Sequence, residues 1–188
     1  MIEIAKAERI IKSNTISKAM EKYKCIMGQV YKIDVTQDTA FQKMFCDFYQ
    51  LRRFYSDTFK TRYLDVLQKM KHKDNLSFKE VFECVMEIKN TREMSFSSKL
   101  IHTVDPKYPI WDSIVTEQHF KMKKPYVKDN VVEKFSERYD EYVEKFYKYM
   151  ESSEGAEVIR LFDIEYPESG ITNVKIIDFV LWQDRNNS

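Results

Sequence analysis

A lysine and an aspartate, Lys99 and Asp112, lie 13 positions apart in the stretch SFSSKLIHTVDPKYPIWDSIV, residues 95–115. A lysine amine that has lost its proton can act as a nucleophile, and a carboxylate can stabilise a positive charge that develops beside it. Two of the chain's four prolines fall between the two residues. The stretch is therefore either a turn between two helices or an arrangement that brings an amine and an acid together.

The expected surroundings of Lys99 favour an unprotonated amine. If Ser97 is the N-cap of a short helix over 97–104, Lys99 falls in the first helical turn, where the helix dipole disfavours an ammonium group. Its apolar neighbours, among them Phe96 and Leu100, would remove water from the amine and act in the same direction. Both effects lower the pKa of the lysine, which is what a catalytic amine requires.

Each of these residues also has a structural interpretation. Lys99 can be a solvated charge on an amphipathic helix, and Asp112 can be a helix N-cap that contributes about 1 kcal/mol. The two can also form a structural ion pair, which would leave the lysine charged and unreactive. His102 lies about one turn beyond Lys99 and could modulate the charge of the lysine, but a packed histidine is the expected role. Trp111 could stack on a nucleotide, but the expected role is that of a core anchor.

Residues of about 78 to 120 resemble the helix-hairpin-helix DNA glycosylases. In that family the hairpin has the pattern G-[VI]-G, a catalytic lysine follows two residues after the second glycine, and a catalytic aspartate begins a later helix. Here Ser95 and Ser97 occupy the glycine positions, Lys99 the lysine position and Asp112 the aspartate position. Together with the terminal KIIDFVLWQ, the segment FSSKLIHTVDPKYPIWDSIV is also similar to an uncharacterised bacterial family linked to 8-oxoguanine DNA glycosylase-like folds.

The resemblance implies an all-α fold with a helix-hairpin-helix-like element near residues 78–104. It also implies recognition of DNA and excision of a damaged base, with Lys99 as the nucleophile and Asp112 as its electrostatic partner. Two features depart from the family pattern. Serines replace both glycines, although glycine is the residue that adopts a positive φ readily. The spacing from lysine to aspartate is also several residues shorter than usual, so the helix between them must be shorter by about a turn.

The alternative is a non-catalytic module that kept the fold, lost the reaction and binds nucleic acid or another protein. The two hairpin serines and the formal net charge of +1 favour this alternative. The sequence therefore leaves open whether the chain is an enzyme of the DNA glycosylase/lyase class, and it does not specify an oligomeric state.

Charge is distributed unevenly along the chain. Residues 43–73 carry eight Lys or Arg and three Asp, residues 99–128 carry six and three acids, and residues 129–168 carry five and twelve acids. The two basic segments could attract a polyanion such as DNA. In FYQLRRFYSD, Arg52 and Arg53 can hold phosphate beside tyrosines that stack a base, or they can lie over aromatic faces at the surface. The candidate nucleic-acid-binding residues are Ser95, Ser97, Ser98, Arg52, Arg53 and Lys121.

The composition argues against several other classes of protein. With 43% hydrophobic and 32% charged residues the chain is not a disordered one, and no apolar run approaches the roughly 20 residues of a membrane span. Its first residues lack the apolar region of a signal peptide. Cys25, Cys46 and Cys84 are odd in number and far apart, so they are expected to be buried free thiols in a reducing cytoplasm. The three histidines form no metal-ligand spacing with them, and neither a metal nor a cofactor is expected.

Apolar residues recur at helical spacing through the whole chain, as in Phe41, Met44, Phe45 and Phe48. Capping residues precede four of these segments, at Asp38, Ser56, Ser77 and Thr172. About nine helices are predicted, over 2–13, 15–32, 38–54, 56–71, 77–91, 97–104, 112–120, 129–152 and 172–184. A short helix over 155–162 is a further candidate. The chain is thus predicted to be a single all-α domain, residues 1–188.

Overall fold

Helices form wherever the sequence places apolar residues three and four positions apart. The computed structural model describes residues 2–51, 56–89 and 91–184, and no β-strand occurs among them. The prediction of an all-α fold is confirmed. The helices are α1 (Ile4–Ile11), α2 (Asn14–Gln29), α3 (Thr39–Phe48), α5 (Asp57–Met70), α6 (Phe78–Lys89), α7 (Met94–Val104), the π-helix η1 (Val115–His119), α8 (Val131–Met150), α9 (Ser153–Glu165) and α10 (Asn173–Gln183).

Four predicted helix starts, those with a capping residue, are confirmed by their caps. In each case the side chain accepts a hydrogen bond from the backbone N–H three residues later, which contributes about 1 kcal/mol per helix. The four capping residues are Asp38, Ser56, Ser77 and Thr172.

Several helices differ from their predicted bounds, among them α3, α7 and α9. The helix α3 ends at Phe48, because Gln50 adopts a left-handed backbone with φ of 60°, and part of the predicted helix 38–54 lies outside the described residues. The helix α7 begins at Met94, three residues before the predicted start. The candidate short helix over 155–162 is present and longer, as α9.

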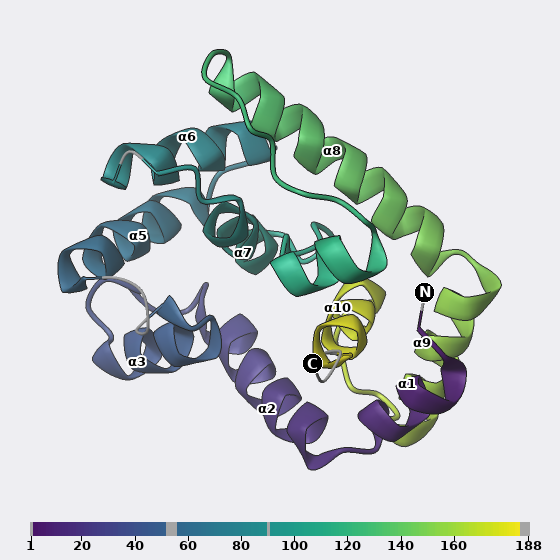
Figure 1. The fold of residues 1–188 in the computed structure, drawn as a ribbon. Helices are drawn as coiled ribbons and strands as arrows, with labels where there is room; N and C mark the ends of the chain where they lie inside the picture. The colour runs from purple at the N-terminus through teal and green to yellow at the C-terminus, as the bar shows by residue number, and fades with distance from the viewer. Residues whose placement is uncertain (1, 52–55, 90, 185–188) are drawn as a thin grey trace.

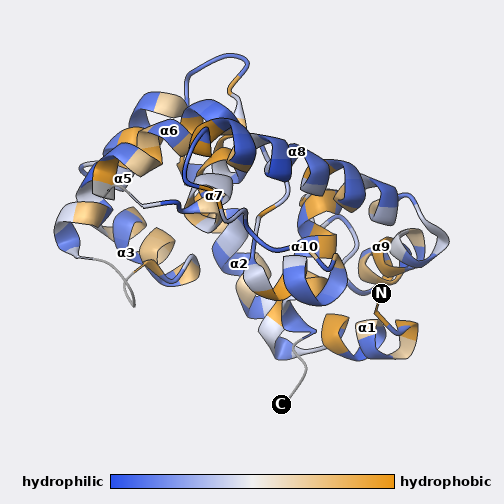
Figure 2. Ribbon diagram, turned by 45° about the horizontal axis from the view of Figure 1, so that its top comes forward, coloured by the Kyte–Doolittle hydropathy of each residue, from blue (hydrophilic) through white to orange (hydrophobic). Residues whose placement is uncertain are grey.

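The core consists largely of Phe and Tyr rings. The helix α8 turns Phe135 and Tyr139 toward α6, where Tyr139 stacks on Phe78 with ring centroids 3.8 Å apart and Phe135 stacks on Phe82 at 5.1 Å. Figure 2 shows the outward faces of α8 in hydrophilic colours, as expected of an amphipathic helix. The buried residues form one continuous cluster that includes residues from Ile2 to Leu181.

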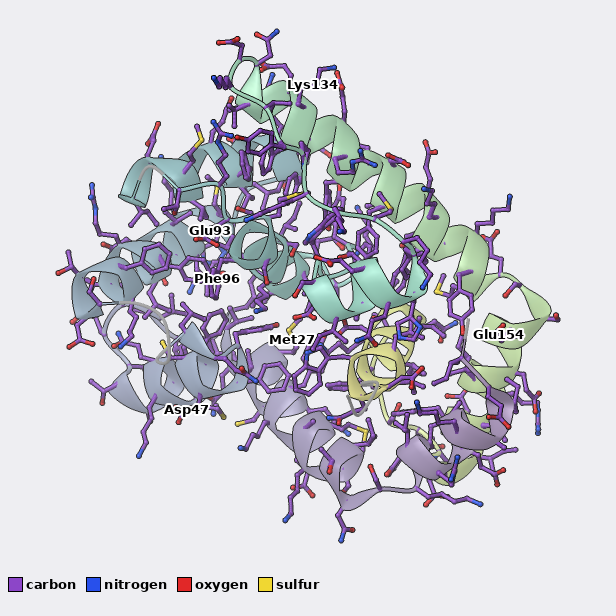
Figure 3. The ribbon with its side chains drawn as sticks, viewed as in Figure 1. Met27, Asp47, Glu93, Phe96, Lys134 and Glu154 are labelled. Carbon is purple, nitrogen blue, oxygen red and sulfur yellow. The ribbon has the colours of Figure 1, made fainter. Side chains whose placement is uncertain are left out.

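The helix α10 lies near the middle of the molecule, with α2 along one side of it and α7 and η1 on the other (Figure 1). It contacts α8, α9 and η1, while α1 packs against α9 and α2 against α3. The backbone N–H of Ile2 donates to Oε1 of Glu154 at 2.7 Å, which attaches the beginning of the chain to α9 (Figure 3). Five segments surround a common space: the start of α2, the end of α3, α7, the segment 110–114 and α10.

The cysteines only partly follow the prediction. None of the three forms a disulfide within the described residues. Cys46 is buried and Cys84 half-buried, but Cys25 is exposed, because Tyr23 and Ile26 occupy the buried side of α2. The prediction of burial is therefore wrong for Cys25. In the described part of the chain, none of the helices combines the length and the apolar character needed to cross a membrane.

Candidate functional site

Lys99 lies in the second turn of α7 and is half-buried. Its Nζ donates to the backbone oxygen of Tyr49 at 3.4 Å and lies 4.7 Å from the centre of the Phe96 ring. Glu93, which Figure 3 labels near Phe96, is the N-cap residue, so the assignment of the N-cap to Ser97 is wrong. Burial lowers the pKa of Lys99, while the charge of Asp112 opposes that shift. The expected direction is found, but its main cause is burial rather than the helix terminus.

Asp112 closes the turn that follows α7. Its Oδ1 accepts a hydrogen bond from the backbone N–H of Ile114 at 2.9 Å, and its backbone oxygen accepts from the N–H of Thr116 at 2.8 Å. Asp112 therefore makes the bond of a capping residue to the short helical turn at 113–114 that precedes η1, whose own N-cap residue is Ile114. One carboxylate oxygen makes that capping bond, and the half-buried side chain also lines a pocket.

The segment that carries Asp112 is held by buried hydrogen bonds. The hydroxyl of Tyr139 donates to the backbone oxygen of Pro109 at 2.7 Å, and that of Tyr142 donates to the oxygen of Ile110 at 3.0 Å. The ring of Trp111 packs edge-on against Tyr142, with 5.2 Å between centroids, and the residue is 4% exposed. Trp111 is thus a core anchor, and α8 fixes the backbone from which Asp112 projects.

Lys99 and Asp112 line the same cavity, which has a volume of about 630 Å³. In the described part of the chain no ion pair within 4.0 Å joins the two side chains, so the structural ion pair considered above is not formed. The helices α3 and α10 supply aromatic walls, with Phe48 on one side and Phe179 and Trp182 on the other. The cavity therefore combines an amine, a carboxylate and ring-sized apolar surfaces.

A second lysine and aspartate line the cavity from α10. Lys175 and Asp178 are 3% and 7% exposed in their side chains, and Nζ lies 2.6 Å from Oδ2. The Lys175 amine lies over the rings of Phe179 and Tyr23, at 4.4 and 5.0 Å from their centres. Burial raises the pKa of Asp178, and the neighbouring Lys175 opposes that shift. Sequence reasoning missed this pair, although two charges in the apolar run NVKIIDFVLW are the signal that could have revealed it.

His102 is a packed, neutral histidine. Its Nδ1 lies 2.7 Å from the backbone oxygen of Tyr108 and its Nε2 lies 3.0 Å from the hydroxyl of Tyr23. A carbonyl oxygen can only accept, so Nδ1 donates and Nε2 accepts from the tyrosine. Complete burial lowers the pKa of His102 to about 3. The packed interpretation is the correct one.

Two of the three serines proposed to contact phosphate face the interior of the protein. The hydroxyl of Ser97 donates to the backbone oxygen of Glu93 at 2.9 Å, and that of Ser98 donates to the oxygen of Ser95 at 2.9 Å. Ser97 and Ser98 are fully buried and Ser95 is half-buried. Because the two buried hydroxyls present no surface to a ligand in this conformation, phosphate contacts by Ser97 and Ser98 are not proposed further.

The hairpin positions of the resemblance fall inside α7. Ser95 and Ser97 lie in its first turns with φ below zero, so neither needs the freedom of glycine. The connection from α6 to α7 precedes them, at residues 90–93, of which residue 90 lies outside the described residues.

Of the three basic residues proposed to bind nucleic acid, only Lys121 lies among the residues that the structure describes. Arg52 and Arg53 lie outside the described residues. Lys121 is exposed, has a left-handed backbone with φ of 55° and does not line the cavity. No group of three His, Cys, Asp or Glu side chains suited to a metal ion occurs in the ranges that the structure describes.

Comparison of the chain with protein-family models, with curated proteins and with solved structures found no match.

Proposed function

We propose that this protein recognises DNA and excises a damaged base, with Lys99 as the nucleophile and Asp112 as its electrostatic partner. The observation that carries the proposal is that these two side chains line one cavity without pairing with each other. We place this activity in the cytoplasm, where a DNA substrate is accessible.

The environment of Lys99 suits the first step of such a reaction. Because burial lowers the pKa of its amine, a larger fraction is unprotonated near neutral pH than for a solvated lysine. The lone pair would form a bond to C1′ of the deoxyribose as the bond from C1′ to the base breaks, and the base would leave with a proton. The carboxylate of Asp112 would stabilise the positive charge that develops on the sugar.

The dimensions of the cavity suit an extruded nucleotide. Its volume of about 630 Å³ falls in the range of roughly 300–1,000 Å³ found for small-molecule sites. Enzymes that act on a base take it out of the stack and hold it between apolar or aromatic side chains. Phe48, Phe179 and Trp182 supply such surfaces around Lys99 and Asp112.

A non-catalytic binding module is the second candidate. The observation that favours it is the burial of Ser97 and Ser98, which removes the hairpin hydroxyls from any contact with DNA. Such a module would bind nucleic acid with an affinity that falls steeply with salt, or bind a protein with a flat salt response. In either case it would form no covalent adduct with DNA.

Trapping of a covalent intermediate tests the proposal. A DNA duplex with an abasic site presents C1′ as an aldehyde, which condenses with an amine to an imine and water, and borohydride reduces the imine to a stable secondary amine. We expect the unmodified protein to be trapped and Lys99→Met to lose the adduct. Lys107→Met is the matched control, because Lys107 is exposed and outside the cavity.

A panel of duplexes with damaged bases then tests excision itself, by release of the base. Absence of an adduct on the abasic duplex, together with no base release across the panel, would contradict catalysis. Salt-dependent binding without either product would support the binding module instead.

A further inference from the structure

One face of α2 forms part of the rim of the cavity. Asn14, Thr15, Lys18, Ala19 and Lys22 all line it. Residues four apart lie on the same side of a helix, so Lys18 and Lys22 project side by side toward the opening. Both side chains are exposed.

The two lysines carry charge that the protein does not neutralise by a direct ion pair. Among the described residues neither Lys18 nor Lys22 lies within 4.0 Å of a carboxylate oxygen. Glu21, on the same helix, is exposed and does not line the cavity. The cavity therefore has a rim with two cationic side chains that can bind an anion.

Acidic side chains also line the cavity. One of them is Asp47, near the end of α3, which Figure 3 labels. The inner acids are Asp112 and Asp178, each accompanied by a lysine that lines the same cavity. An anionic group that approaches the cavity is therefore attracted to the two lysines on its α2 rim.

We propose that Lys18 and Lys22 bind the phosphates next to the nucleotide whose base enters the cavity. This inference rests on the proposed function and adds to it the side from which the DNA backbone reaches Lys99. In protein–DNA interfaces, lysine contacts to phosphate fix the position of the duplex while other groups read or modify the base. A rim with two adjacent ammonium groups beside aromatic walls matches the phosphates and the base of one DNA strand.

The inference is tested with a duplex that contains a tetrahydrofuran abasic analogue, which has no aldehyde and forms no adduct. Its dissociation constant is measured by fluorescence anisotropy over a series of salt concentrations for three proteins. They are the unmodified protein, the double variant Lys18→Gln/Lys22→Gln, and the control Lys24→Gln/Lys32→Gln. The control also removes two positive charges, but from outside the cavity lining, where Lys24 and Lys32 are exposed.

Each phosphate contact contributes about 0.9 to the slope of log affinity against log salt concentration for double-stranded DNA. We expect Lys18→Gln/Lys22→Gln to lower that slope by about 1.8 and the affinity near 0.1 M salt by roughly tenfold for each contact. The control should keep the slope of the unmodified protein. Equal slopes and affinities for the two double variants would overturn the inference.

The trapping experiment distinguishes the two failures. If the unmodified protein forms the Lys99 adduct but the two double variants bind alike, the proposed function stands and the α2 rim is not the phosphate site. If the unmodified protein neither binds the duplex nor forms the adduct, the proposed function fails and this inference fails with it.

Discussion

The backbone N–H of Trp111 donates a buried hydrogen bond to Oγ of Ser98, with 2.8 Å between the two atoms. Ser98 directly precedes Lys99, and Trp111 directly precedes Asp112. One hydrogen bond therefore connects the backbone positions next to the two candidate catalytic residues. It explains how a spacing of 13 residues still brings both side chains to one cavity, because the chain returns to α7 as soon as the turn after Val104 is complete.

Replacement of Ser98 by alanine tests this connection. The variant leaves the N–H of Trp111 buried without its acceptor, and we expect the free energy of unfolding to fall by about 1–3 kcal/mol. Urea denaturation measures the change. Ser153→Ala, at an exposed position in α9, is the control and should change stability by about 0.5 kcal/mol or less. If Ser98→Ala were as stable as the control, the bond would not be what holds the two segments together.

The reactivity of Lys99 should depend on pH in a specific way. The ordinary pKa of a lysine is 10.5, and burial lowers that of Lys99. The rate of adduct formation with an abasic duplex should therefore rise with pH and level off at a pH below 10.5. The charge of Asp112 raises the pKa of Lys99, so Asp112→Asn should move the inflection to still lower pH while asparagine keeps the N-cap. An inflection at the ordinary value would show that the reacting amine is a solvated one.

His102 should make the protein less stable in mild acid. The unfolded chain binds a proton at His102 below about 6.5, whereas the folded protein does so only near pH 3. Between these values the unfolded state holds more protons, so stability is lost as pH falls, by up to about 1.4 kcal/mol per pH unit. Urea denaturation between pH 7 and pH 4 measures the loss. His102→Gln should be less sensitive to pH over this range, and an unchanged slope in that variant would contradict the assignment.

The buried pair of Lys175 and Asp178 should show strong energetic coupling. Removal of either partner leaves an unpaired charge in the interior, and we expect Lys175→Met or Asp178→Leu alone to cost about 3–5 kcal/mol. The double variant replaces both charges with apolar groups, so it should cost far less than the sum of the single variants. A double-mutant cycle in urea measures this difference. Additive effects would mean that the two side chains do not depend on each other.

Much of the fold follows from local signals in the sequence. Apolar periodicity and the caps at Asp38, Ser56 and Thr172 locate the helices, because both act within a few residues. The start of α7 cannot be predicted in this way, because its N-cap residue Glu93 makes no side-chain capping bond and so gives no local signal in the sequence.

The candidate site was only half predictable. Lys99 and Asp112 are close in the sequence, and the resemblance already paired them. Lys175 and Lys18 come from distant helices, and a single lysine in a helical pattern is usually a solvated charge. Only the packing of α2 and α10 around α7 shows that these lysines share a cavity with Lys99.

The most direct test of the account is to locate the reduced DNA adduct by mass spectrometry of peptides from the trapped protein. The account predicts that the modification lies on the peptide that contains Lys99, and that Lys99→Met yields no modified peptide from the cavity. An adduct confined to the N-terminal amine or to exposed lysines, with Lys99 unmodified, would contradict it.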